Sequence, residues 1–335
     1  MLTIEEIEAA CGSPHPVKLP KNEMEPPEFE FEETFYPFGF PLTVRSNSDS
    51  VLEQYGELWG QFDMQYDREP IPVGVQLVES DSTECPPAPS YRLMMPLIMA
   101  VADQHNYGIV DLDHLYAKIV VSRAALQHPL YLQYFLLGMP GTCIATAYAT
   151  PVHAGCVALE GRGILLCGDS GAGKSTLSYA CARNGWTYVS DDACFLLNGG
   201  SQRIISGDCF KVRFRPEAVE LFPEIRGLKT TPRAAGKPSI ELRTDAMPQV
   251  MRSQTAHVDF VVFLNRRSGG PQQLVPYRKE VVRQFMRQVL IGSAITRAVQ
   301  YAAIENLLTA EILELRYSDI HWAVDHLRML VEKGG

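Results

Sequence analysis

The sequence Gly168-Asp169-Ser170-Gly171-Ala172-Gly173-Lys174-Ser175-Thr176 fits the pattern G-x-x-x-x-G-K-[ST]. In a loop of this kind, backbone N–H groups cradle phosphates, the lysine reaches the outer phosphates and the following hydroxyl holds Mg²⁺. The alternative is a glycine-rich turn that binds nothing. The pattern predicts that all nine residues surround the phosphates of a bound nucleotide.

The residues on either side of this loop fit the same interpretation. Gly163–Cys167 is a short apolar run, typical of a buried strand in a parallel sheet. Leu177–Asn184 predicts a helix, and Gly185 after it is the usual residue for a left-handed helix end. Strand, glycine loop and helix N-terminus in this order aim free N–H groups at an anion. We therefore expect an α/β domain that binds a nucleotide, with ATP favoured.

The composition is that of an ordinary globular protein. The chain has 335 residues, of which 46% are hydrophobic, and it is long enough for two domains. The net charge of −9 argues against a general nucleic-acid binder, which needs a basic face. The eight cysteines include no C-x-x-C pair, and the first residues lack the basic and apolar regions of a secretory signal. We expect a cytoplasmic protein with reduced cysteines and no nucleic-acid partner.

Residues 124–159 contain no Asp, Glu, Lys or Arg. A membrane span is one explanation of such a run. Prolines and glycines cut it into pieces too short to cross a bilayer, so the sequence predicts buried core and no membrane span.

Residues 1–150 are predicted to form a smaller α+β region that precedes the loop-bearing domain at 151–335. Apolar patterning indicates strands and one helix, which starts at Ser48 or Asp49 and ends near Phe62. No catalytic constellation stands out in this region, so substrate recognition, oligomerisation and a lid all remain open as its role. The strands are expected in a proline-interrupted segment at 29–44 and at 72–78, 91–100, 107–112 and 115–122.

Two features flank the loop. His153 lies fifteen residues before Gly168 (168 − 153 = 15), ahead of an apolar strand. Asp191-Asp192 follows the segment 186–190, at the end of the next expected strand. A carboxylate at this position serves the Mg²⁺ shell in nucleotide-binding proteins. The alternatives are a polar turn for the acid pair and an ordinary packed histidine for His153.

The spacing of these three motifs resembles that of the C-terminal catalytic domain of bacterial HPr kinase/phosphorylase and its related kinases. The resemblance covers about residues 150–200. It implies the fold shared with phosphoenolpyruvate carboxykinase, and transfer of the γ-phosphoryl group of ATP to a serine hydroxyl of a protein.

The resemblance also implies a role for each matched residue. Lys174 would steady the β- and γ-phosphates, and Ser175 would ligate Mg²⁺. Asp192 would accept the proton of the attacking hydroxyl. Asp191 would lie near the metal, and His153 would orient or tune the carboxylate.

The chain departs from the family pattern at two places. Thr176 stands after the loop serine, where typical members have glutamate. The segment 222–228 contains a Glu-Ile-Arg-Gly-Leu string like the one around a metal-binding glutamate of the family, which makes Glu224 a third candidate metal ligand. An amphipathic helix that ends at Gly227 explains the same residues equally well. Lys229-Thr230-Thr231 follows the Glu-Ile-Arg-Gly-Leu string, where Gly-Ile-Ile is expected in the family.

A basic segment follows within this acidic chain. It could clamp phosphates or an acidic substrate, with Arg226 and Lys237 as the candidate residues, or it could be a solvated loop. No counterpart of the family's phosphorylase-specific region is found. The segment contains Lys211, Arg213, Arg215, Arg226, Lys229, Arg233, Lys237 and Arg243.

The C-terminal part completes the expected α/β domain. Residues 258–264 and 312–317 predict buried strands, and 278–308 is expected to be mostly helical. Ser318 or Asp319 is expected to cap a last helix.

Taken together, these features predict a kinase that uses ATP and Mg²⁺. Its acceptor is expected to be a hydroxyl, with serine favoured, on a protein, a peptide or a small molecule, and a second copy of the chain is a candidate partner. Two alternatives stay open: a nucleotide-binding regulator without transfer activity, and a phosphorylase or pyrophosphate-linked enzyme of the same fold.

Overall fold

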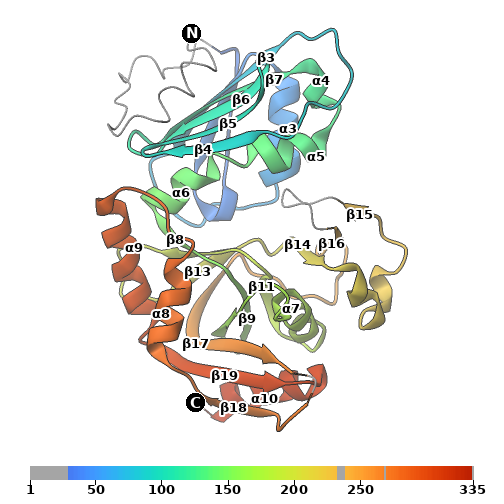
Figure 1. Cartoon of the computed structure of the whole chain (residues 1–335), viewed down its shortest axis with the longest axis vertical. Helices are drawn as coiled ribbons and strands as arrows, with labels where there is room; N and C mark the ends of the chain where they lie inside the picture. The colour runs from blue at the N-terminus through green and yellow to red at the C-terminus, as the bar shows by residue number, and fades with distance from the viewer. Residues whose placement is uncertain (1–28, 232–237, 268, 334–335) are drawn as a thin grey trace. The chain divides into compact units, whose positions relative to one another are not determined.

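A computed structural model describes residues 29–231, 238–267 and 269–333. The chain divides into two compact units (Figure 1). The first comprises the described residues up to Ala147 together with Gly292–Thr296, and the second comprises the remaining described residues. Both contain strands and helices, so the protein is a mixed α/β protein with several sheets. Within the described ranges, no helix has the length and apolar character needed to cross a membrane.

The first unit is built on a seven-stranded sheet in the order β1-β2-β3-β7-β6-β5-β4. Strands β2, β3 and β7 run parallel, and helix α3 makes the crossover between the first two. The buried ring of Tyr55 on α3 stacks on Phe35 of β1, with centroids 5.9 Å apart. The elements are β1 (Phe31–Phe35), η1 (Pro37–Gly39), β2 (Leu42–Ser46), α3 (Asp49–Trp59), β3 (Ile71–Val78), β4 (Ser90–Met94), β5 (Leu97–Asp103), β6 (Asn106–Asp111), β7 (Tyr116–Ser122), α4 (Arg123–Leu126), α5 (Pro129–Tyr131), η2 (Leu132–Leu137) and α6 (Gly141–Ala147).

The strand predicted at 91–100 is wrong as a single element. It is a hairpin, in which β4 and β5 pair antiparallel and the chain turns between Met94 and Leu97. The apolar run continues through the turn, so periodicity alone does not reveal it. The other predicted strands of this unit are confirmed with small shifts at their ends, and 124–159 is largely buried as expected.

The second unit contains a nine-stranded sheet organised around the long strand β17. The start of β17 pairs antiparallel with β13, and the rest lies between parallel neighbours β10 and β19. One half of the sheet continues through β12 to β8, and the other through β9 to β11. The strands are β8 (Ala149–Val152), β9 (Ala154–Leu159), β10 (Arg162–Cys167), β11 (Thr187–Ser190), β12 (Cys194–Leu197), β13 (Ile204–Gly207), β17 (Thr255–Arg266), β18 (Gln273–Pro276) and β19 (Glu311–Tyr317).

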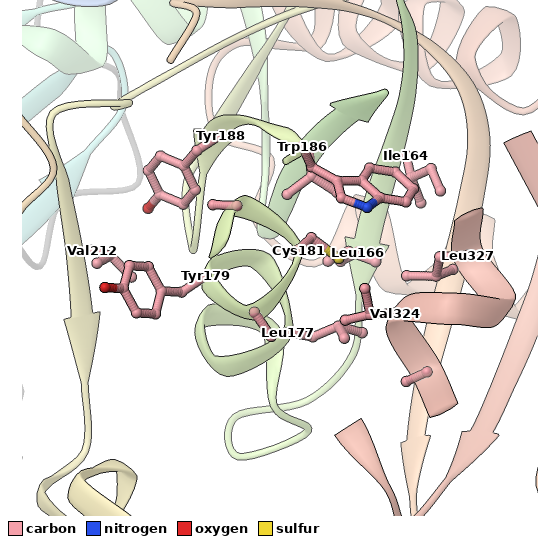
Figure 2. Close-up of a cluster of buried hydrophobic side chains, with 14 of the residues drawn as sticks. Ile164, Leu166, Leu177, Tyr179, Cys181, Trp186, Tyr188, Val212, Val324 and Leu327 are labelled. Atoms are coloured by element: carbon pink, nitrogen blue, oxygen red, sulfur yellow. The ribbon is translucent and has the colours of Figure 1, made fainter. Parts of the chain in front are cut away.

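Helix α7 (Lys174–Arg183) follows the loop and lies in a buried apolar cluster (Figure 2). Tyr179 faces Val212 on one side of the helix, and Val324 and Leu327 of α10 (Ile320–Lys333) lie on the other. Burying a side chain of this size contributes roughly 2 kcal/mol. The helix and the loop at its N-terminus are therefore held from both sides. Two further helices, α8 (Lys279–Arg287) and α9 (Ala294–Leu307), occupy the region expected to be helical.

A small sheet in the order β14-β16-β15 stands beside α7. In β14 (Lys211–Phe214), Val212 and Phe214 are buried. Because side chains alternate along a strand, Lys211 and Arg213 face the other way. Arg215 continues this alternation, since its backbone is still extended (ψ 154°). The partner strands are β16 (Ser239–Arg243) and β15 (Thr230–Thr231).

Between β14 and β15 the chain forms two 3₁₀ turns, η3 (Pro216–Glu220) and η4 (Pro223–Ile225). The amphipathic helix that was one expectation here is not formed. Pro223 has no N–H to donate, and its ring blocks the preceding turn, so a helix begun at Pro216 stops before it. The cap expected for the last helix is confirmed, because the Asp319 carboxylate accepts a hydrogen bond from the Trp322 N–H at 2.7 Å.

Candidate functional site

The glycine-rich loop joins the end of β10 to the start of α7, as the sequence predicts. Gly168, Gly171 and Gly173 have φ angles of 147°, 94° and 98°, which side chains with a Cβ rarely adopt. A Cβ on Gly173 would lie 2.7 Å from the hydroxyl of Tyr317. The loop therefore needs glycine at these places to turn tightly into the helix, whose first N–H groups point towards the loop.

The chain crosses twice from one half of the sheet to the other, and both of these connections, called passages below, lie near the loop. His153 joins β8 to β9, and residues 191–193 join β11 to β12. Ala154 pairs with Cys167, the last residue of β10, so His153 stands next to the first residue of the loop. Because β8 also pairs with β12, the two passages are neighbours. The sheet register thus brings the histidine and the acid pair together.

Three predicted site residues meet at this point. The Lys174 Nζ lies 3.1 Å from the His153 Nε2, and the His153 Nδ1 lies 3.5 Å from the Asp192 Oδ1. An ammonium group can only donate, so Nε2 accepts and the ring proton belongs on Nδ1, facing the carboxylate. Lys174, His153 and Asp192 form a chain from the helix start to the second passage between the sheet halves.

Lys174 is folded back onto its own loop. Its side chain is buried, and Nζ donates to the Gly168 carbonyl at 2.7 Å. Burial lowers the pKa of Lys174, and the charge of Asp192 opposes this shift. A phosphate oxygen in the loop would be a stronger acceptor than a neutral carbonyl, because both partners would then be charged. Lys174 Nζ can therefore exchange the Gly168 carbonyl for an oxygen of an incoming anion.

The two carboxylates have different surroundings. Asp191 is 8% exposed, and its carboxylate accepts hydrogen bonds from the Arg213 backbone N–H at 3.0 Å and from the Ser175 hydroxyl. Burial raises the pKa of Asp191 to about 6, against the lowering effect of the Arg213 N–H. The Asp192 side chain is 44% exposed. One acid is therefore tied to the loop hydroxyl, and the other is open to solvent beside His153.

Arg215 contacts the loop; it belongs to the basic segment predicted to clamp phosphates, in which Arg226 and Lys237 were the residues singled out. Its guanidinium donates to the Ser170 hydroxyl at 3.1 Å, and the guanidinium atoms lie 3.7–3.9 Å from the position of a Cβ on Gly171. The sequence contained a signal for it, since basic residues at 211, 213 and 215 alternate with the apolar Val212 and Phe214. That alternation predicts a strand with one basic face, but not what the face contacts.

The remaining candidates lie elsewhere or outside the described residues. The Glu224 Oε1 accepts from the Tyr179 hydroxyl at 2.9 Å and lies 3.3 Å from Arg183 Nη1, which places it one to two helical turns beyond Ser175 along α7. Arg226 is exposed after η4. Lys237 falls in 232–237, outside the described residues. The structure brings the loop, His153 and the acid pair together, and it gives Glu224 a contact with the middle and end of α7.

The residues present fit a nucleotide with its cation. A Cβ on Gly168 would lie 2.9 Å from the Ala172 Cβ, so the tight cradle depends on that glycine. The hydroxyl of Ser175 and the carboxylate of Asp191 are hard oxygen donors, the kind that Mg²⁺ takes together with substrate phosphates. In the described part of the chain no three His, Cys, Asp or Glu residues form a metal-binding group of their own.

Comparison with known proteins finds weak similarity among solved structures. No family model matches the sequence, and no curated protein matches it. Among solved structures, the HPr(Ser) kinase/phosphatase from Coxiella burnetii is 15% identical over 55% of this chain and 95% of that chain, with a TM-score of 0.30.

Proposed function

We propose that this chain is a kinase that uses ATP and Mg²⁺ and transfers the γ-phosphoryl group to a hydroxyl, with serine favoured, of a protein, a peptide or a small molecule. The observation that carries this proposal is the chain of contacts from Lys174 through His153 to Asp192 at the glycine loop. A protein that only binds a nucleotide needs the loop and the lysine. It needs neither a histidine nor an open carboxylate beside them.

In this proposal the residues of the loop would hold the phosphates through backbone N–H groups, and Lys174 would exchange the Gly168 carbonyl for a phosphate oxygen. Ser175 and Asp191 would hold Mg²⁺, which neutralises phosphate charge when bound. The phosphates would occupy the N-terminus of α7, where the helix dipole favours negative charge.

Transfer is proposed to proceed by attack of the acceptor oxygen on the γ-phosphorus. The bond from that phosphorus to the bridging oxygen breaks, and its electron pair stays on the β-phosphate of ADP. The acceptor proton goes to the Asp192 carboxylate, which is exposed enough to meet a hydroxyl. The Nδ1–H of His153 would keep that carboxylate turned towards the site.

The proposal is tested by measuring ADP formation from Mg·ATP, with and without candidate hydroxyl acceptors. Lys174→Ala is expected to abolish both binding and turnover, because the charge that meets the outer phosphates is gone. Asp192→Asn is expected to keep ATP binding and to lose at least about 100-fold in turnover, the usual worth of a positioned general base. Asp325→Asn, an exposed carboxylate on α10, is the matched control and should leave both unchanged.

The outcomes separate the alternatives. Normal turnover in Asp192→Asn would refute the assignment of the base. ATP binding without ADP formation under any condition would favour a regulator that has no transfer activity. Release of pyrophosphate from a phosphorylated acceptor in the presence of inorganic phosphate would favour the phosphorylase alternative.

A further inference from the structure

Arg215 lies against the outer turn of the glycine loop. Its guanidinium donates to the Ser170 hydroxyl, and three of its atoms lie within van der Waals distance of where a Cβ on Gly171 would be. Ser170 and Gly171 are the middle of the segment whose backbone N–H groups cradle phosphates in a loop of this pattern. A guanidinium in this place lies within reach of a phosphate group held by the loop.

The strand that carries Arg215 is anchored to the site at a second point. Two residues earlier, the Arg213 N–H donates to the Asp191 carboxylate. On the other face of β14, Val212 and Phe214 are buried against α7. The strand is therefore fixed relative to the acid pair and the helix, and the base of the Arg215 side chain is placed with the same precision.

The neighbouring cations on this sheet are engaged with carboxylates. The Lys211 Nζ lies 3.4 Å from the Asp208 Oδ2, and the Arg213 Nε lies 2.9 Å from the Glu241 Oε2. The contact described for Arg215 is with a neutral hydroxyl of the loop, and Arg215 is exposed. Its charge is thus directed at the loop, whereas the charges of the other two are offset by acidic side chains.

We propose that Arg215 is a built-in arginine clamp that binds the γ-phosphoryl group during its transfer. The inference rests on the proposed kinase function. On arrival of the nucleotide, the guanidinium would leave the Ser170 hydroxyl for two phosphate oxygens, since its planar fork suits such paired acceptors.

The clamp acts on charge that develops during the reaction. As the acceptor oxygen bonds to phosphorus and the bond to the bridging oxygen breaks, the electron pair moves to ADP and the acceptor proton moves to Asp192. The transferred group carries its charge on three outer oxygens at that moment. Arg215 neutralises this charge and takes no proton, so its contribution belongs to turnover more than to nucleotide affinity.

The experiment compares turnover of Mg·ATP with binding of two probes, Mg·ADP alone and Mg·ADP with aluminium fluoride, which mimics the phosphoryl group in transit. Arg215→Ala is expected to lower turnover by about 1,000-fold, the lower end for a catalytic arginine of this kind. Its affinity for Mg·ADP should stay within about threefold of wild type. The increase in this affinity that aluminium fluoride gives the wild-type protein should be lost. Arg215→Lys should restore only a small part of the turnover and of the response to aluminium fluoride.

Arg287→Ala removes an exposed, ion-paired arginine of α8 and is the matched control, expected to behave as wild type. Arg215→Ala with wild-type turnover and a wild-type response to aluminium fluoride would overturn the clamp while leaving the kinase proposal intact. A wild-type protein that binds Mg·ADP and never consumes ATP would refute the kinase function, and the clamp with it.

Discussion

Asp191 and Asp192 are neighbours in sequence with opposite surroundings. The first is buried and accepts hydrogen bonds from the Arg213 backbone N–H and the Ser175 side chain, and the second is partly exposed beside His153. Pairs of acids whose environments differ in this way are suited to divide metal binding from proton transfer. The division comes from the path of the chain, which is buried up to Asp191, reaches the surface at Asp192 and Ala193, and is buried again at Cys194.

The buried state of Asp191 predicts a pH dependence of stability in the absence of Mg²⁺. Burial raises its pKa to about 6, above the value of about 4 expected in the unfolded chain. The folded protein therefore binds this proton more tightly, so the contribution is fully present below pH 4 and is lost as the pH rises through 6. The expected loss by pH 8 is roughly 3 kcal/mol in the free energy of unfolding.

Urea unfolding of Asp191→Asn and wild type from pH 4 to pH 8, with a chelator present, measures this loss. The asparagine variant keeps an acceptor for the Arg213 N–H and should lack the decline. Asp325→Asn should decline as wild type does. Parallel curves for wild type and Asp191→Asn would show that the carboxyl of Asp191 does not titrate in this range.

Much of the site was predictable from the order of the elements. The apolar run that became β10, the glycine loop and the helix after it could be predicted from residue type alone. The helix begins at Lys174, three residues before the expected Leu177, because the loop itself supplies the first turn. The approach of His153 also follows from sequence, once 154–167 is recognised as a hairpin with its turn at Glu160-Gly161, both at positive φ.

Other parts depend on contacts that no local pattern encodes. The contact of Arg215 with Ser170 needs the pairing of β14 with β16 and the packing of Phe214 on α7, which join distant segments. The segment from Pro216 was ambiguous because its apolar spacing suits a helix. Its prolines favour two short turns instead.

The contact between η4 and α7 predicts a structural effect of Glu224. This carboxylate accepts from Tyr179 and pairs with Arg183, so Glu224→Gln is expected to lower the free energy of unfolding by about 1 kcal/mol. Urea unfolding measures the effect. The Mg²⁺ concentration needed for half-maximal ATP turnover should not change.

Glu220→Gln, an exposed acid on η3, provides the comparison and should alter neither quantity. If Glu224→Gln keeps its stability and needs much more Mg²⁺, Glu224 is a metal ligand, as the Glu-Ile-Arg-Gly-Leu string suggests.

The two units have separate sheets, and all the residues proposed to act on phosphate lie in the second. A ligand that binds only the folded state stabilises it in proportion to the logarithm of its concentration. Mg·ADP is therefore expected to slow amide hydrogen exchange in peptides that cover 162–183 and 187–214. Exchange in β3 and β7 of the first unit should change little.

Hydrogen exchange with mass detection, with and without Mg·ADP, tests this distribution. Lys174→Ala should remove the protection, and Asp325→Asn should retain it. Protection confined to the first unit would place the nucleotide away from the loop.

The hairpin of β9 and β10 restricts how the distance between His153 and the loop can vary. Every residue added to one strand must be matched in the other if the imidazole is to stay level with the first loop glycine. The interval of fifteen positions (168 − 153) can therefore grow or shrink only in steps of two while the turn keeps its length. A functional homologue with this hairpin is therefore expected to have an odd sequence interval from the histidine to the first loop glycine. A single-residue insertion in either strand should move the imidazole out of register with that glycine and abolish turnover, while the sheet remains folded.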